Sequence, residues 1–95
     1  MREFANVELL VGDWREHLPI RAPFELIFFD AGHADDSEDA IDLLAPAGLF
    51  VKDDLTPNRP GPDPVRDLLL NHAHLVAVEV LTTPETAAIV AARRA

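Results

Sequence analysis

The segment FELIFFD, residues 24–30, constrains the fold more than any other stretch of the chain. Leu26, Ile27, Phe28 and Phe29 are apolar at consecutive positions, so both faces of an extended strand would be apolar. This pattern is typical of a parallel strand that is covered on each side by helices. The segment therefore predicts an inner strand of an α/β sheet.

Predicted strands and helices alternate along the chain. Short apolar runs predict strands at residues 7–11, 24–30, 49–54 and 75–81, and helical patterns predict helices at 14–18, 35–46 and 64–71. Residues 86–94 are rich in alanine, which favours a helix, but Ile89 and Val90 favour the return strand of a hairpin, which we prefer. This order predicts an α/β sheet that is mostly parallel, with helices on its faces and a C-terminal antiparallel hairpin.

The ends of the predicted helices carry local signals. The first helix is expected to end just before Pro19, because proline disfavours helical backbone in the residue that precedes it. Asp36 or Ser37 is expected to cap the second helix, where acidic residues also favour the positive end of the helix dipole. Asp63 and Pro64 predict the cap and the first residue of the third helix.

The charge of the chain limits its partners. Eight basic residues against 17 acidic ones give a formal net charge of −9, which argues against nucleic acid or an anionic membrane surface. The chain has no cysteine, so disulfides and thiolate metal sites are excluded. Its apolar runs are too short to span a bilayer. The 95 residues are expected to form one soluble, cytoplasmic domain.

Acidic residues follow three of the predicted strands. Asp13 comes after the first strand, Asp30 ends the second, and Asp53 with Asp54 ends the third. Ligands of open α/β sheets bind beyond the carboxyl ends of the strands. We therefore expect these carboxylates to lie at one edge and to form a site, although each could instead be a loop or capping aspartate.

Three segments together resemble a known family. In order, VGDWREHLP, FELIFFDAGHADD and AIDLLAPAGLFVKDDLTP resemble the second half of a class I S-adenosylmethionine-dependent methyltransferase, particularly the O-methyltransferases of the catechol and caffeoyl-CoA type. The resemblance implies a partial Rossmann-like sheet and methyl transfer to the hydroxyl group of a small molecule. Ala47 stands where the family has glycine, and alanine is expected to tolerate most turns that do not need a positive φ.

The resemblance also implies roles for the acidic residues. Asp13 and Trp14 would lie beside the adenine ring of S-adenosylmethionine, and Asp30 would face its sulfonium end. In the metal-dependent branch of the family, Asp30, Asp53 and Asp54 match three ligands of a divalent cation. Oxygen ligands of this kind suit magnesium, manganese or calcium. Trp14 could instead be a hydrophobic staple at the start of its helix.

His33 stands where the family has the lysine that serves as general base. Histidine can take up a proton near neutral pH, so the catalytic role is retained on chemical grounds. The alternative is a histidine in a surface loop beside two aspartates, with no catalytic task. Asp54 is a second departure, because the family usually has asparagine at this position.

The family's first half has no counterpart in the chain. No sequence like G-x-G-x-G occurs, and two central strands are missing between those predicted at 7–11 and 24–30. The second strand would then have an open apolar edge, which we expect to mediate a homodimer, to bind a companion polypeptide or to pair with the first strand. Three interpretations stay open: part of a methyltransferase that is inactive alone, a non-catalytic remnant or dimerisation module without cofactor, and a metal-binding acidic domain.

Overall fold

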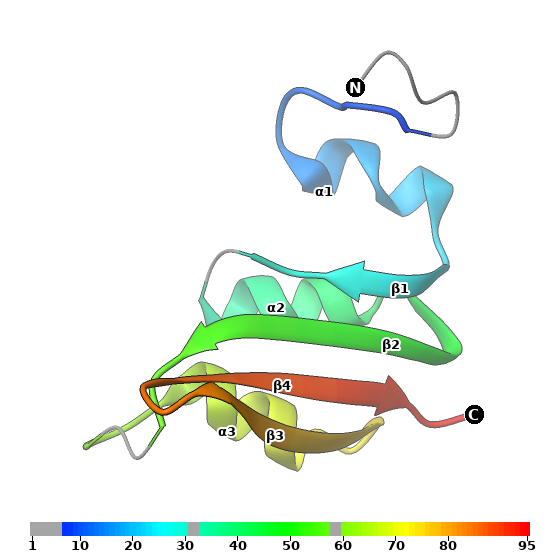
Figure 1. Cartoon of the computed structure of the whole chain (residues 1–95). Helices are drawn as coiled ribbons and strands as arrows, with labels where there is room; N and C mark the ends of the chain where they lie inside the picture. Colours follow the sequence, from blue (N-terminus) through cyan, green and yellow to red (C-terminus); the bar gives the residue numbers. More distant parts are fainter. Residues whose placement is uncertain (1–6, 31–32, 58–59) are drawn as a thin grey trace.

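The computed structural model describes residues 7–30, 33–57 and 60–95. Its elements in chain order are α1 (Trp14–His17), the 3-10 helix η1 (Pro19–Arg21), β1 (Phe24–Phe28), α2 (Ala34–Ile41), β2 (Leu44–Leu55), α3 (Pro64–Asn71), β3 (Leu75–Thr83) and β4 (Thr86–Arg93), shown in Figure 1. In the described parts of the chain, no helix is both long and apolar enough to cross a membrane.

The strands form one four-stranded sheet in the order β1-β2-β4-β3. The predicted α/β class and the C-terminal antiparallel hairpin are confirmed, since β3 pairs antiparallel with β4. The strand β1 pairs parallel with β2, and β2 pairs antiparallel with β4. Parallel pairing is thus limited to one strand pair among the described residues. The predicted strand at 7–11, which would belong to the parallel part, does not form.

The segment 7–11 is irregular, so the prediction of a strand there is wrong. Its side chains Leu9 and Val11 are 79% and 86% exposed. A strand needs a neighbour that pairs with its backbone groups, and Figure 1 shows this segment on the far side of α1 from the sheet. No described strand therefore lies beside it, and the expected pairing of 7–11 with β1 does not occur.

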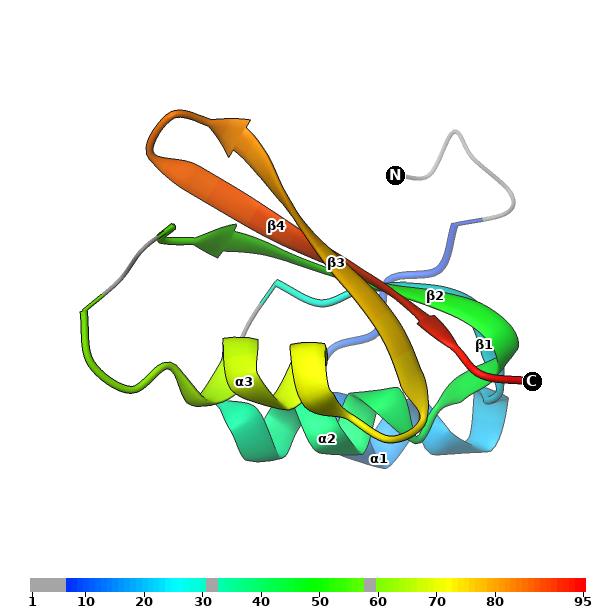
Figure 2. The same cartoon turned by 90° about the horizontal axis from the view of Figure 1, so that it is seen from below.

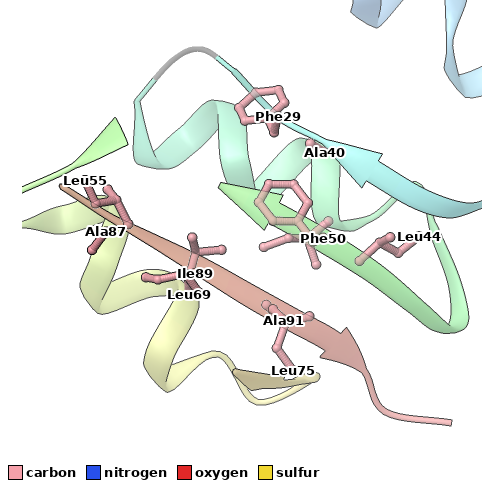
Figure 3. Packing of buried hydrophobic residues seen from close by; sticks show 11 residues of the cluster. Phe29, Ala40, Leu44, Phe50, Leu55, Leu69, Leu75, Ala87, Ile89 and Ala91 are labelled. Carbon is pink, nitrogen blue, oxygen red and sulfur yellow. The ribbon is translucent and has the colours of Figure 1, made fainter. Parts of the chain in front are cut away.

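The helix α1 lies beyond the edge of β1 (Figure 1), whereas the helices α2 and α3 lie on one face of the sheet (Figure 2). Figure 3 shows the core between them, where Phe50 of β2 and Ile89 of β4 point toward the helices and are fully buried together with Ile41 and Leu69. The opposite face of the sheet has no such cover from the described residues. The prediction that the strand at 24–30 is covered on both faces is therefore wrong.

The start of α2 differs from the prediction. The helix runs over Ala34–Ile41 and its N-cap is His33, not Asp36 or Ser37. Asp36 instead lies at the third helical position, where its carboxylate accepts a hydrogen bond of 2.8 Å from the backbone N–H of His33. The helix also ends before residues 44–46, which belong to β2. By contrast, α3 has the predicted cap Asp63 and begins at Pro64.

The turn before the straight part of β2 needs two special backbone positions. Ala47 has a φ of +64°, which contradicts the expectation of an ordinary turn at this residue. Gly48 is crowded, because a Cβ there would lie 2.8 Å from the carbonyl oxygen of Ala45 and 3.0 Å from that of Phe24. In this turn, glycine therefore stands at the crowded position 48, and an alanine stands at position 47, where the backbone is left-handed.

Candidate functional site

The parallel pairing of β1 with β2 sets the position of two predicted site residues. Phe28 is paired with Val51, and the backbone N–H of Phe29 donates a 2.9 Å hydrogen bond to the carbonyl oxygen of Val51. Asp30 and Asp53 each come two residues after this pair. The two aspartates are therefore brought to the same edge of the sheet, beyond the carboxyl end of β1.

The site includes the start of α1, which lies near the same edge. Asp13 is the N-cap of α1, and its carboxylate accepts a 3.0 Å hydrogen bond from the backbone N–H of Arg15. The ring of Trp14 meets the ring of Phe29 edge to face, with 5.8 Å between the centroids. Because Phe29 directly precedes Asp30, this contact brings the Asp13–Trp14 pair toward the end of β1.

Arg15 holds α1 against α2, a role that the sequence patterns did not reveal. Its guanidinium pairs with the carboxylate of Asp36 and, at 3.0 Å, with that of Asp39. The same group lies 4.4 Å from the centroid of the Trp14 ring, as a cation–π contact. A basic residue next to Trp14 and an acidic stretch in α2 were the available signals, but neither specifies that the two helices meet.

His33 is exposed at the beginning of α2, three residues after Asp30. Its backbone N–H and the nearby guanidinium of Arg15 both lower the pKa of Asp36 below its ordinary range, the backbone hydrogen bond being the larger cause. The carboxylate of Asp36, which accepts the hydrogen bond from the backbone of His33, therefore stays ionised at neutral pH. This arrangement fixes the backbone at His33 and leaves its imidazole accessible.

Two cavities adjoin Trp14. The larger, of about 370 Å³, runs between α1 and β1 and is lined by apolar side chains, including those of Trp14, Leu18 and Phe28. The smaller, of about 240 Å³, is lined by residues of the 7–11 segment and α1, including Gly12 and His17. Gly12 has a φ of +124°, and a Cβ there would lie 2.9 Å from Nε2 of His17. Glycine is thus required at the bend that forms this cavity.

The predicted metal ligands are only partly brought together. Asp54 is exposed and has a φ of +59°, next to the half-buried Asp53. Within residues 7–30, 33–57 and 60–95, no three carboxylate or imidazole groups are grouped closely enough to hold a metal ion. Asp30, Asp53 and Asp54 therefore stay predicted ligands, and no ready-made metal centre is present in the described residues.

Comparisons of the sequence with known proteins find no relative. No protein-family model matches the chain, and no curated protein matches it closely enough to count as one. Comparison of the structure with solved structures does find similar folds. The fold, and not sequence similarity, is therefore the link from this chain to characterised proteins.

Three solved structures illustrate the similarity. Cofactor-bound Rv0187 from MTB has a TM-score of 0.67 and 21% identity, over 93% of this chain and 50% of that one. The O-methyltransferase from Bacillus cereus in complex with SAH has a TM-score of 0.56 and 19% identity, over 77% and 41% of the two chains. TomG from Streptomyces achromogenes, an O-methyltransferase involved in tomaymycin synthesis and solved with SAM, has a TM-score of 0.56 and 20% identity, over 88% and 48%.

The chain spans about half the length of these structures. Identities of this size establish the fold alone. The chain has an O-methyltransferase-like fold, of which it forms about one half.

Proposed function

We propose that this chain forms one side of an S-adenosylmethionine site in an O-methyltransferase, and that it acts together with the missing half of the fold. The observation that carries the proposal is the shared edge at the end of β1. There the parallel register of β1 and β2 carries Asp30 and Asp53 to the same edge of the sheet, and the Trp14–Phe29 contact brings in α1. Carboxyl ends of parallel strands are the usual ligand sites of open α/β sheets.

The residues around Trp14 fit an adenosyl group. Arg15 lies over one face of the indole ring, and the cavity of about 240 Å³ adjoins Trp14 and Gly12. A flat aromatic base suits a cavity beside an indole, because offset or edge contacts between rings are favourable. Asp13 is already the cap of α1, so its second carboxylate oxygen is the group proposed to contact the cofactor. When bound, S-adenosylmethionine would supply the methyl group.

Asp30 and His33 are proposed to act on the reacting groups. The carboxylate of Asp30 would attract the positively charged sulfonium end of the cofactor, since opposite charges attract strongly where water is excluded. The exposed imidazole of His33 would take the proton from the hydroxyl group of the small-molecule acceptor. Since the described residues contain no grouped set of three metal ligands, we derive no step through a metal ion.

Calorimetric titration of the chain with S-adenosylmethionine, which carries the sulfonium charge, tests this proposal. We expect binding in the micromolar range, weakened at least tenfold by Asp30→Ala. The matched control is Asp42→Ala, which removes an exposed carboxylate at the other end of α2. No heat at millimolar ligand, or equal weakening by both variants, would contradict the assignment of the site to this edge.

A further inference from the structure

Arg15 connects the start of α1 with α2 through several contacts. Its backbone N–H donates a 3.0 Å hydrogen bond to the carboxylate of Asp13, and its guanidinium lies 4.4 Å from the centroid of the Trp14 ring. The same guanidinium pairs with the carboxylates of Asp36 and Asp39, the contact with Asp39 being 3.0 Å long. One residue therefore joins the proposed adenosyl contacts to α2.

The two carboxylate oxygens of Asp36 have different partners. Oδ1 pairs with the guanidinium of Arg15, and Oδ2 accepts a 2.8 Å hydrogen bond from the backbone N–H of His33. An ionised carboxylate only accepts hydrogen bonds and has two oxygens, so it can hold both donors at once. Both contacts involve a charged group, which makes them stronger than neutral hydrogen bonds. A continuous chain of contacts thus runs from the indole ring, through these two side chains, to the backbone of His33.

The guanidinium is suited to this connection because it is planar and rigid. Its Nη2 and Nε atoms bind Asp36 and Asp39, which are three positions apart and therefore lie on the same side of α2. The rest of the group lies over the indole ring of Trp14. A change in the orientation of the indole is therefore passed on to the carboxylates of α2.

These contacts are partly exposed to water. The side chains of Arg15, Asp36 and Asp39 are 38%, 26% and 54% exposed. Exposed ion pairs contribute little to folding stability, so the chain should fold without them. A cofactor in the cavity beside Trp14 would exclude water from this side of α1, and unlike charges attract more strongly where water is excluded. Binding at the indole should therefore tighten the ion pair and, with it, the hydrogen bond to His33.

We propose that Arg15 is a positioning residue that couples cofactor binding at Trp14 to the placement of His33. It acts through Asp36 and takes no part in the chemical step. This inference rests on the proposed function, because it takes Trp14 as part of the adenosyl site and His33 as the base. Coupling between two sites is reciprocal, so a correctly placed His33 also raises the affinity for the cofactor.

A two-dimensional NMR titration of the ¹⁵N-labelled chain with S-adenosylhomocysteine, which has the same adenosyl group, tests the coupling. Trp14 is the only tryptophan, so its indole N–H gives a single signal. In the unsubstituted chain, this signal and the backbone amide of His33 should shift along one binding curve. Arg15→Met keeps a long side chain but removes the guanidinium. It should abolish the shift at His33 and weaken binding at Trp14 by about fivefold, the lower end of typical coupling.

Two aspartates of α2 provide matched variants. Asparagine has a single acceptor oxygen, so Asp36→Asn can keep the hydrogen bond from His33 or the contact with Arg15, but not both. It should therefore abolish the shared shift. Asp39→Asn also removes a carboxylate that pairs with Arg15, but the N–H of His33 is bound by Asp36. The shared shift should survive this second substitution.

The free chain gives a test that needs no ligand. Arg15→Met should move the backbone amide resonance of His33, and Asp36→Asn should move the indole resonance of Trp14. Each substituted side chain reaches the observed group only through its partner in the chain of contacts. Resonances that both stay in place would overturn the coupling, whatever the cofactor does.

Each outcome of the titration decides the question. The coupling is supported if Arg15→Met and Asp36→Asn lose the His33 shift while circular dichroism shows both variants folded. A shift at Trp14 without one at His33 overturns the coupling but leaves the cofactor site in place. A His33 shift that survives Arg15→Met, or that Asp39→Asn also abolishes, overturns it as well. No shift at Trp14 with millimolar ligand contradicts the cofactor site itself, and the coupling with it.

Discussion

The turn at Ala47 allows a test of the local structure by stabilisation. Ala47 has a φ of +64°, a left-handed conformation that costs a residue with a Cβ about 1–2 kcal/mol. Glycine adopts this conformation without steric cost. It loses more conformational entropy on folding than alanine does, however, and this loss opposes folding by about 0.5–1 kcal/mol. Ala47→Gly should therefore raise the free energy of unfolding by about 0.5–1 kcal/mol, or the melting temperature by about 2–8 °C in a domain of this size.

Gly48→Ala is the matched change with the opposite expected sign. Its new Cβ would approach the carbonyl oxygens of Ala45 and Phe24 at 2.8 and 3.0 Å, and both belong to backbone that cannot rotate away. Overpacking of this kind should destabilise the chain by about 1–3 kcal/mol. Urea denaturation followed by circular dichroism, at one fixed protein concentration, measures both changes. A destabilising Ala47→Gly together with a neutral Gly48→Ala would show that neither the left-handed backbone of Ala47 nor the crowding at Gly48 affects stability as expected.

Three further predictions concern charged groups. Arg66 pairs with Asp63 and donates at 2.7 Å both to Glu79 and to the carbonyl oxygen of Thr56. Arg66→Met should cost about 2 kcal/mol in urea denaturation, because it leaves the buried carboxylate of Asp63 without its partner, and an unchanged midpoint would contradict this. The pKa of Asp36 is lowered from its ordinary value of 3.8, so its stabilising effect is present above that value and is lost as the pH falls through the lower folded-state pKa. Asp36→Asn should accordingly lower the melting temperature at pH 7 but not in strong acid, and an equal loss at both would argue against the ion pair. If the predicted ligands bind a cation in solution, magnesium or manganese should raise the melting temperature and Asp53→Ala should abolish the rise, whereas no rise at saturating metal would count against the ligands.

Local signals predicted the parts of the fold that depend on neighbours in sequence. Asp63 and Pro64 begin α3 as expected, because a side-chain cap and a proline act on the backbone within one helical turn. The hairpin of β3 and β4 also forms, although the alanines of β4 favour helix. Pairing with β2 on one side and with β3 on the other outweighs the helix propensity of these alanines, because tertiary context overrides local propensity.

Features that depend on distant partners could not be predicted from the same patterns. The apolar run at 24–30 specifies that both faces of β1 favour burial, but the described residues supply cover for one face only. The segment 7–11 has the composition of a strand, yet strand formation needs a partner that the chain does not place beside it. The contact of Arg15 with α2 joins residues 21 and 24 positions apart, and no local spacing encodes it.

Asp13, Trp14 and Asp30 are proposed to lie along one cofactor-binding edge. The most direct test is a two-dimensional NMR titration of the ¹⁵N-labelled chain with S-adenosylhomocysteine. The indole N–H of Trp14 and the backbone amides of Asp13 and Asp30 should shift together along one binding curve. Shifts that are absent at millimolar ligand, or that appear instead around the turn between β3 and β4, would contradict this assignment.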